Sequence, residues 1–167
     1  MHGTRSGGEL RTRPAHIRDA AALAALLNAV IAEGGKTAIS EPLSASQCAE
    51  WFISGPHCVS CIVAVDDAGR PVGFQALERF HDDLAPDQAD IATFVTAGMR
   101  GAGVGRELAH VTLGLARTKR LASVRATIRR HNQDAVRYYE SLGFRGEGAF
   151  VTKDTVTLTY RCGGADM

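Results

Sequence analysis

The sequence predicts a single α/β (α+β) domain built around one mixed, mostly antiparallel sheet, with a crossover helix in the middle of the chain and about four helices in total. Segments rich in β-branched residues are interleaved with amphipathic helices. The 167 residues match one domain of ordinary size, and no internal repeat or low-complexity linker divides them. A chain of this length buries roughly 70% of its unfolded surface, so it folds without disulfides or a metal.

The first third of the chain predicts a strand and two helices. Leu10 to Ala15 is a short candidate strand. A core-facing helical stripe follows, formed by Leu23, Leu26, Leu27, Val30 and Ile31. Asp19 is a suitable N-cap for this helix, and Gly34-Gly35 ends it. Ser44-x-x-Gln47 is a capping-box pattern in front of a short second helix, which Gly55-Pro56 ends.

Three strands are predicted next. Cys58 to Val65 and Val72 to Phe80 flank a turn that contains Gly69, so we expect them to pair as a hairpin. A polar loop leads to the third strand, Asp90 to Thr96.

The second half of the chain alternates between helices and strands. Apolar residues at i, i+4, i+7 and i+11 predict a helix over about Gly103 to Lys119. Ser123 to Ile128 is a strand, and Asn132 to Leu142 is a helix that Gly143 ends. Phe144 to Val151 and Thr155 to Tyr160 form the closing pair of strands.

Composition and charge exclude several kinds of partner. The 19 Lys and Arg residues balance 18 Asp and Glu residues, giving a formal net charge of +1, which argues against nucleic acid. The longest apolar stretch, Ala20 to Ile31, is interrupted by Asn28 and is shorter than the roughly 20 residues of a membrane span. The start of the chain lacks the apolar core of a signal peptide, so we expect a cytoplasmic protein without a membrane partner. We expect residues 1–8 to be disordered, residues 9–162 to form the domain and residues 163–167 to form a tail.

The four cysteines, Cys48, Cys58, Cys61 and Cys162, are predicted to be free thiols. Cys58-x-x-Cys61 has the spacing of half a zinc site or of a redox pair, but no second pair with ligand spacing follows. Its neighbours predict a strand, where a buried free cysteine is ordinary. We therefore predict no metal site.

A glycine-rich turn, Met99-Arg-Gly-Ala-Gly-Val-Gly-Arg106, joins the third strand to the long helix. Glycine allows positive φ in such a turn, and the N-terminus of the helix offers free N–H groups to phosphate oxygens. A P-loop would need Lys where Val104 stands, and the dinucleotide fingerprint would need glycine where Arg106 stands. Arg100-x-x-Gly103-x-Gly105 remains, which alone fits either a phosphate site or a simple helix start.

A second pattern, Asn132-x-x-Ala135-x-x-x-Tyr139-x-x-x-Gly143-Phe144, follows the next strand. Alone, it fits a core aromatic residue on an amphipathic helix. Together with the glycine turn about thirty residues earlier, it resembles the Gcn5-related N-acetyltransferase (GNAT) superfamily over nearly the whole chain, from Leu10 to the last strand.

The resemblance implies a sheet that is splayed in its middle, along the strand from Asp90 to Thr96. Free backbone groups there, chiefly those of Val95 and Thr96, would pair with the pantetheine of acetyl-CoA, and an N–H near Phe94 or Val95 would stabilise the oxyanion. Acetyl-CoA is then the expected co-substrate. The expected cofactor-binding residues are Phe94, Val95, Thr96, Arg100, Gly101, Ala102, Gly103, Val104, Gly105, Arg106, Asn132 and Tyr139.

Three residues are catalytic candidates, and the resemblance points to the first two, Tyr139 and Asp90. Tyr139 matches the superfamily tyrosine that points at the thioester sulfur, where a phenol can protonate the leaving thiolate; packing alone is the alternative role. Tyr138 is expected to face another side of the helix. Asp90 falls where a related branch places a glutamate base, and Glu78 on the neighbouring strand is the second candidate.

That branch contains the phosphinothricin N-acetyltransferases, and the likeness lies in Leu27-Asn28, Ile31, Lys36-Thr37-Ala38, Glu41-Pro42 and Trp51-Phe52. It implies a small-molecule amine acceptor, an amino acid or its analogue, and a possible homodimer. The loop from Glu78 to Ala89 departs from the branch. Acetylation of a protein or peptide amine, and a non-catalytic acetyl-CoA-binding module, are the alternatives.

Overall fold

The computed structural model describes residues 10–37, 39–151 and 153–163, and the side chains of residues 147–151 are not described. The expected disordered segment, residues 1–8, and residues 164–167 of the expected tail lie outside the described residues. Within the described ranges, no helix has the length and apolar character needed to cross a membrane.

Seven strands form one sheet in the order β1-β2-β3-β4-β5-β7-β6, which confirms the predicted mixed α/β class. The strands are β1 (Arg11–Pro14), β2 (Cys58–Val65), β3 (Pro71–Glu78), β4 (Gln88–Val95), β5 (Ser123–Arg129), β6 (Arg145–Val151) and β7 (Thr155–Arg161). The helices are α1 (Ala20–Glu33), α2 (Ala45–Cys48), α3 (Val104–Thr118) and α4 (Gln133–Ser141), with short turns η1 (Ile17–Asp19), η2 (Ala49–Ile53) and η3 (Ala97–Met99).

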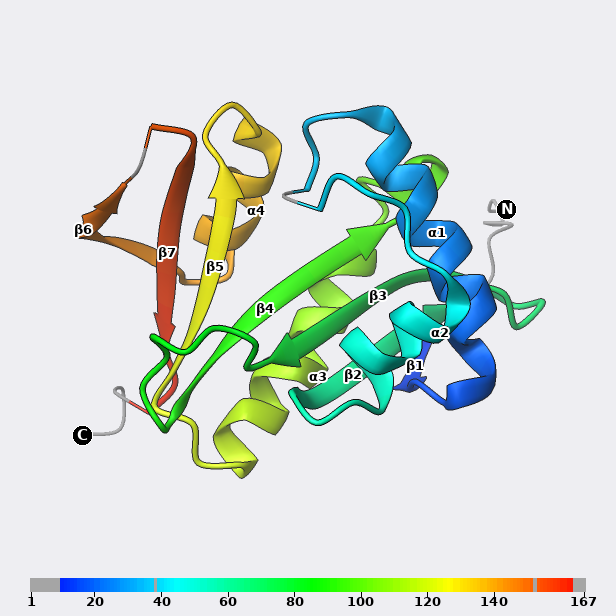
Figure 1. Ribbon diagram of the computed structural model, residues 1–167, viewed down its shortest axis with the longest axis horizontal. Helices are drawn as coiled ribbons and strands as arrows, with labels where there is room; N and C mark the ends of the chain where they lie inside the picture. Colours follow the sequence, from blue (N-terminus) through cyan, green and yellow to red (C-terminus); the bar gives the residue numbers. More distant parts are fainter. Residues whose placement is uncertain (1–9, 38, 152, 164–167) are drawn as a thin grey trace, which may run out of the picture.

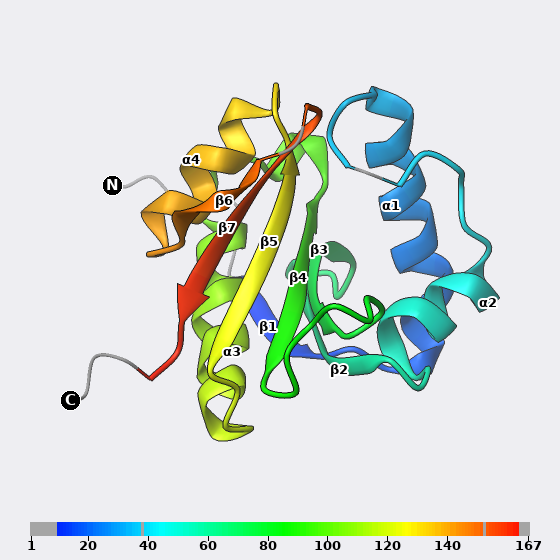
Figure 2. The same ribbon diagram turned by 60° about the vertical axis from the view of Figure 1, so that its left-hand side comes forward.

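The helices cover the two faces of the sheet in pairs. Figures 1 and 2 show α1 and α2 on one face and α3 and α4 on the other. Side chains of a strand alternate between faces, so Val63 of β2 packs in the α1 cluster while Ile62 and Ala64 pack with Leu108 of α3. Because helices cover both faces of the sheet here, β2 is apolar at successive positions from Cys61 to Val65.

Local capping signals in the sequence have the expected geometry at α2. Ser44 Oγ accepts from Gln47 N at 3.1 Å, and Gln47 Oε1 accepts from Ser44 N at 2.9 Å. Asp19 stands at the N-cap of α1 but makes no side-chain cap bond there. Its carboxylate instead pairs with Arg13 at 2.8 Å and accepts from His16 N at 2.7 Å, which ties β1 to the start of the helix.

The central feature of the sheet is a splay between β4 and β5. These two strands run parallel and pair only along Gln88–Asp90 and Ser123–Arg125, whereas β5 pairs with β7 along its whole length. After Asp90 the two strands diverge, as Figure 1 shows. The splayed sheet implied by the resemblance is therefore present.

Asn28, the polar residue that interrupts the apolar stretch from Ala20 to Ile31, holds the segment between α1 and α2 in place. Asn28 Nδ2 donates to Leu43 O at 2.9 Å, and Leu43 N donates to Asn28 Oδ1 at 2.8 Å. The amide thereby satisfies both backbone groups of Leu43 at a partly buried position.

We expect Asn28→Ala to lower the free energy of unfolding by roughly 1–3 kcal/mol, because it leaves the backbone N–H and C=O of Leu43 without partners. Alanine favours a helix more than asparagine does, so helix propensity alone would stabilise this variant. Urea unfolding measures the change, and Ala25→Asn on the exposed side of α1 is the control for propensity. An unchanged unfolding midpoint in Asn28→Ala would contradict the assigned role.

Candidate active site

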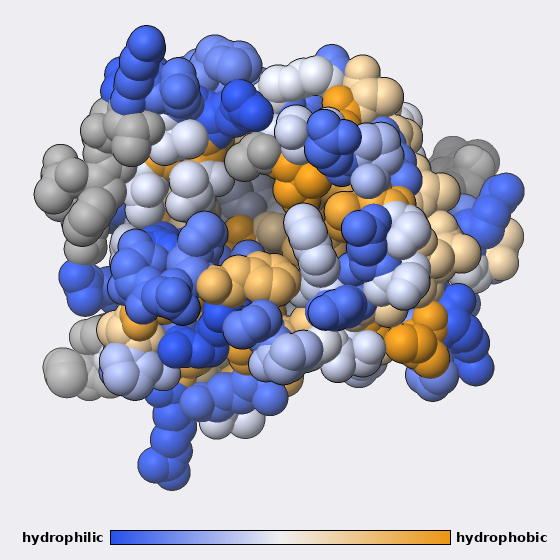
Figure 3. Space-filling view, in the orientation of Figure 1, coloured by the Kyte–Doolittle hydropathy of each residue, from blue (hydrophilic) through white to orange (hydrophobic). Residues whose placement is uncertain are grey.

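Two cavities meet where the sheet splays. The first, here called the α3 cleft, has a volume of about 730 Å³ and lies between the end of β4, the start of α3 and helix α4. The second, the α1-side pocket, has a volume of about 280 Å³ and lies on the α1 face. Figure 3 shows the molecule hollowed between β5 and the α1 side, with apolar side chains along the α1 side of the hollow. Both cavities share the residues at the junction, namely Lys36, Thr93, Phe94, Asn132, Ala135 and Tyr139.

The glycine turn forms one wall of the α3 cleft. Gly101 and Gly103 have φ values of +82° and +90°, and a Cβ at either would meet no atom within 4 Å. Gly103 is also the N-cap of α3 and supplies no side-chain cap, so the first-turn N–H groups of α3 are left for an external acceptor. Anionic groups bind at such a helix start.

Gly105 is required for a different reason. A Cβ at this position would lie 2.7 Å from Cε1 of Tyr138. The Tyr138 hydroxyl donates to Gly105 O at 2.8 Å and accepts from Gln75 Nε2 at 3.0 Å. Tyr138 therefore packs against α3 and lines the α3 cleft beside Tyr139, whereas we had expected it to face another side of α4.

Arg100 is held by partners within the chain. It forms a bidentate pair with Glu33 at the end of α1, at 2.6 and 2.8 Å, and its Nε donates to Val95 O at 3.1 Å. The side chain thus joins α1, the end of β4 and the glycine turn.

The backbone of β4 offers polar groups to the splay at alternate residues. Thr96 N donates to Val72 O at 2.9 Å, so Thr96 and Val72 form a hydrogen-bonded pair. In an antiparallel ladder the neighbouring residues then point their N–H and C=O groups away from β3. Val95 and Thr93 therefore present theirs towards the opening, whereas the Thr96 N–H is used within the sheet.

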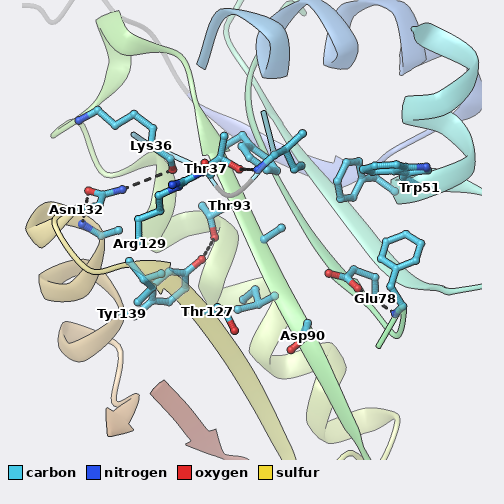
Figure 4. A pocket seen from close by; sticks show the side chains of 18 of the residues that line it. Lys36, Thr37, Trp51, Glu78, Asp90, Thr93, Thr127, Arg129, Asn132 and Tyr139 are labelled. Atoms are coloured by element: carbon cyan, nitrogen blue, oxygen red, sulfur yellow. Dashed lines mark hydrogen bonds between the residues drawn. The ribbon is translucent and has the colours of Figure 1, made fainter. Parts of the chain in front are cut away.

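Tyr139 lies at the junction of the two cavities. Its hydroxyl lies 2.7 Å from Thr93 Oγ1, and Figure 4 shows this pair between β4 and α4. Burial raises the pKa of the Tyr139 phenol above its usual range, which keeps it protonated at neutral pH. Asn132 caps α4 by accepting from Ala135 N at 3.3 Å, and this cap fixes the start of the helix that carries Tyr139.

Most of the residues predicted to bind the cofactor line the α3 cleft. Thr96 and Ala102 are not among its lining residues. The sequence prediction missed Thr93, Lys36 and Tyr138, which line it as well. Lys36 belongs to the Lys36-Thr37-Ala38 likeness but was given no site role, and no local pattern marks the Thr93 side chain, because its place depends on contacts between distant segments.

Two carboxylates lie together in the α1-side pocket. Glu78 and Asp90 face each other across β3 and β4, and both are buried. Figure 4 shows them at one end of the pocket, near Trp51, with Lys36, Arg129 and Asn132 at the other. The Asp90 carboxylate is bound by Arg125, with Nε–Oδ1 at 2.6 Å and Nη2–Oδ2 at 3.1 Å.

The four cysteines are free, as predicted, and Cys48, Cys61 and Cys162 are buried. Burial raises the pKa of the Cys48 thiol to about 11, which leaves it unreactive at neutral pH.

Comparisons with known proteins agree with this geometry. Residues 24–144 match the model of the Acetyltransferase (GNAT) family. The chain is 30% identical over 139 residues to "Putative phosphinothricin acetyltransferase YwnH" of Bacillus subtilis (strain 168), covering 83% of this chain and 85% of the relative. It is 33% identical over 86 residues to the peptidyl-lysine N-acetyltransferase YjaB of Escherichia coli (strain K12), covering 52% and 50%. A phosphinothricin acetyltransferase from Sinorhizobium meliloti, solved in complex with AcCoA, has the same fold, with a TM-score of 0.74, 17% identity and coverage of 91% and 88%.

The chain therefore belongs to the GNAT acetyltransferase family. It is an acetyl-CoA-dependent N-acetyltransferase.

We expect Gly103→Glu to weaken acetyl-CoA binding by at least about 100-fold, because it adds a negative charge at the helix start where phosphate is expected. Any side chain at a φ of +90° is strained, so Gly103→Ala is the matched control. Calorimetric titration of both folded variants with acetyl-CoA measures the difference. Equal affinities in the two variants would show that the turn does not hold the pyrophosphate.

Proposed function

We propose that this enzyme acetylates the primary amine of a small molecule, of the size of an amino acid or its analogue. The observation that carries the proposal is the α1-side pocket, whose volume of about 280 Å³ lies at the low end of small-molecule sites. Trp51 lies at its edge with the ring 5.9 Å from that of Phe80, and this pair limits the length of an acceptor.

The α3 cleft fits the expected co-substrate. Open space beyond Gly101 and Gly103 leaves room for phosphates, and the Val95 and Thr93 backbone groups are directed into the splay. Acetyl-CoA supplies an acetyl thioester, which an amine attacks directly. Val95 O would have to exchange its bond from Arg100 for one from a pantetheine amide.

Tyr139 is the proposed proton donor to the leaving sulfur. Its phenol is protonated at neutral pH, sits where the two cavities meet, and has its oxygen oriented by Thr93. Backbone N–H groups of β4 that point into the splay are the proposed oxyanion donors.

We expect Tyr139→Phe to lower kcat by about 100-fold with little change in acetyl-CoA affinity, because it keeps the ring and removes only the acid. Tyr138→Phe is the matched control, since it removes the neighbouring hydroxyl and its bond to Gly105 O. Turnover is measured under conditions where chemistry limits the rate. Wild-type turnover in Tyr139→Phe would assign this residue to packing.

A screen of free amino acids, other small amines and a lysine peptide for CoA release tests the acceptor class. We expect kcat/KM for the best small amine to exceed that for the peptide by at least about 10-fold, because the pocket is small and Trp51 and Phe80 line one end of it. Preference for the peptide would favour the protein-acetylating alternative, which the partial likeness to a peptidyl-lysine acetyltransferase also raises. Acetyl-CoA binding without turnover on any amine would favour a binding module.

A further inference from the structure

We propose that Glu78 on β3 takes the proton from the acceptor ammonium, and that Asp90 acts as a positioning residue held by Arg125. The inference rests on the proposed function in one respect, namely that the amine occupies the α1-side pocket. It departs from the resemblance, which points to Asp90 as the base.

The Asp90 carboxylate is already occupied. Both of its oxygens accept from Arg125, at 2.6 and 3.1 Å, and Arg125 also donates to both oxygens of Asp83, at 3.1 and 3.3 Å. The Asp90 side chain is only 10% exposed and that of Arg125 17%. Protonating Asp90 would weaken its two charge-assisted hydrogen bonds from Arg125. The partly buried Arg125 guanidinium would then keep only the Asp83 carboxylate as a charged partner.

Glu78 is differently placed. It lies directly opposite Asp90 in the β3–β4 register, lines the same pocket, and accepts one hydrogen bond, from Phe80 N to Oε1 at 3.2 Å. Among the described residues, Glu78 forms no ion pair. A carboxylate in this position can take a proton without losing a cation partner.

Burial, together with the charge of Asp90, raises the pKa of Glu78 to about 7, against the opposing effects of the Phe80 N–H, His81 and Arg125. The charged and titratable groups around it come from several elements, namely Cys58 on β2, Asp90 on β4, Arg125 and Arg129 on β5, His81 in the β3–β4 loop, and Lys36 between α1 and α2. A base with a pKa near the working pH is the most effective.

The protons balance as follows. The ammonium gives one proton to the Glu78 carboxylate, and the N–C bond then forms as the C–S bond of the thioester breaks. The nitrogen loses a second proton as the amide forms, and the sulfur gains one proton as the thiol leaves, so these two transfers cancel. The products are the amide, the thiol and one proton that Glu78 releases to solvent.

The kinetic test compares Glu78→Gln with Asp90→Asn over pH 6 to 9, with one amine throughout. Glu78→Gln should lower kcat/KM by about 100-fold near pH 7 and be partly rescued as pH rises towards the pKa of the amine, because free amine then needs no base. Asp90→Asn removes the charge that raises the pKa of Glu78, so the acid limb of kcat/KM in this variant should move to lower pH, which a purely structural role of Asp90 would not produce. The reverse pattern would make Asp90 the base, and normal turnover in both variants would make solvent the base; either result overturns the proposal.

A second measurement needs no turnover and no change to either carboxylate. The Phe80 amide donates to Glu78, so its ¹⁵N chemical shift in the unliganded enzyme should titrate near pH 7. His81→Gln removes the neighbouring imidazole, and the inflection should remain. A flat Phe80 shift between pH 5.5 and 8.5 in that variant would overturn the proposal even if Glu78→Gln failed to fold.

Discussion

The active site depends on one constraint, the end of hydrogen bonding between β4 and β5 after Asp90. The N–H and C=O groups of Thr93 and Val95 have no neighbouring strand on that side, although an ordinary sheet would satisfy them. The missing ladder is also what lets a cleft on the α3 side and a pocket on the α1 side meet at Tyr139. A donor and an acceptor can therefore reach the same point from opposite faces of the sheet.

The residues at the point where β4 and β5 separate explain why the Asp90 carboxylate has a structural role. Asp90 and Arg125 are the last paired positions of the parallel ladder, and their side chains form the ion pair. The pair joins the two strands at the point where they separate, and through Asp83 it also holds the β3–β4 loop. Because Asp90 is held in this ion pair, it is poorly suited to exchange protons. Glu78, on the neighbouring strand, faces the same pocket and forms no ion pair among the described residues.

The sequence predicted the local features of the fold well, because capping boxes, glycine stops and hydrophobic periods act over a few residues. The Ser44–Gln47 box and the hairpin of β2 and β3 are examples. The order of β6 and β7 in the sheet and the partners of Arg100 were not predictable in this way. The pair of Arg100 with Glu33 joins residues 67 positions apart, and no local pattern encodes such a contact. The splay itself followed only from the resemblance.

The two neighbouring tyrosines of α4, Tyr138 and Tyr139, are connected through the buried side-chain amide of Gln75. Gln75 Nε2 donates to Tyr138 Oη and to Thr93 Oγ1, both at 3.0 Å, and Thr93 in turn contacts Tyr139. Tyr138 continues the chain of contacts to Gly105 at the start of α3. The helix start expected to hold phosphate and the phenol expected to hold the reactive proton are therefore linked by a continuous set of hydrogen bonds. Because Gln75 is fully buried, water does not compete for these bonds, and they hold both tyrosines in fixed positions relative to β3 and β4.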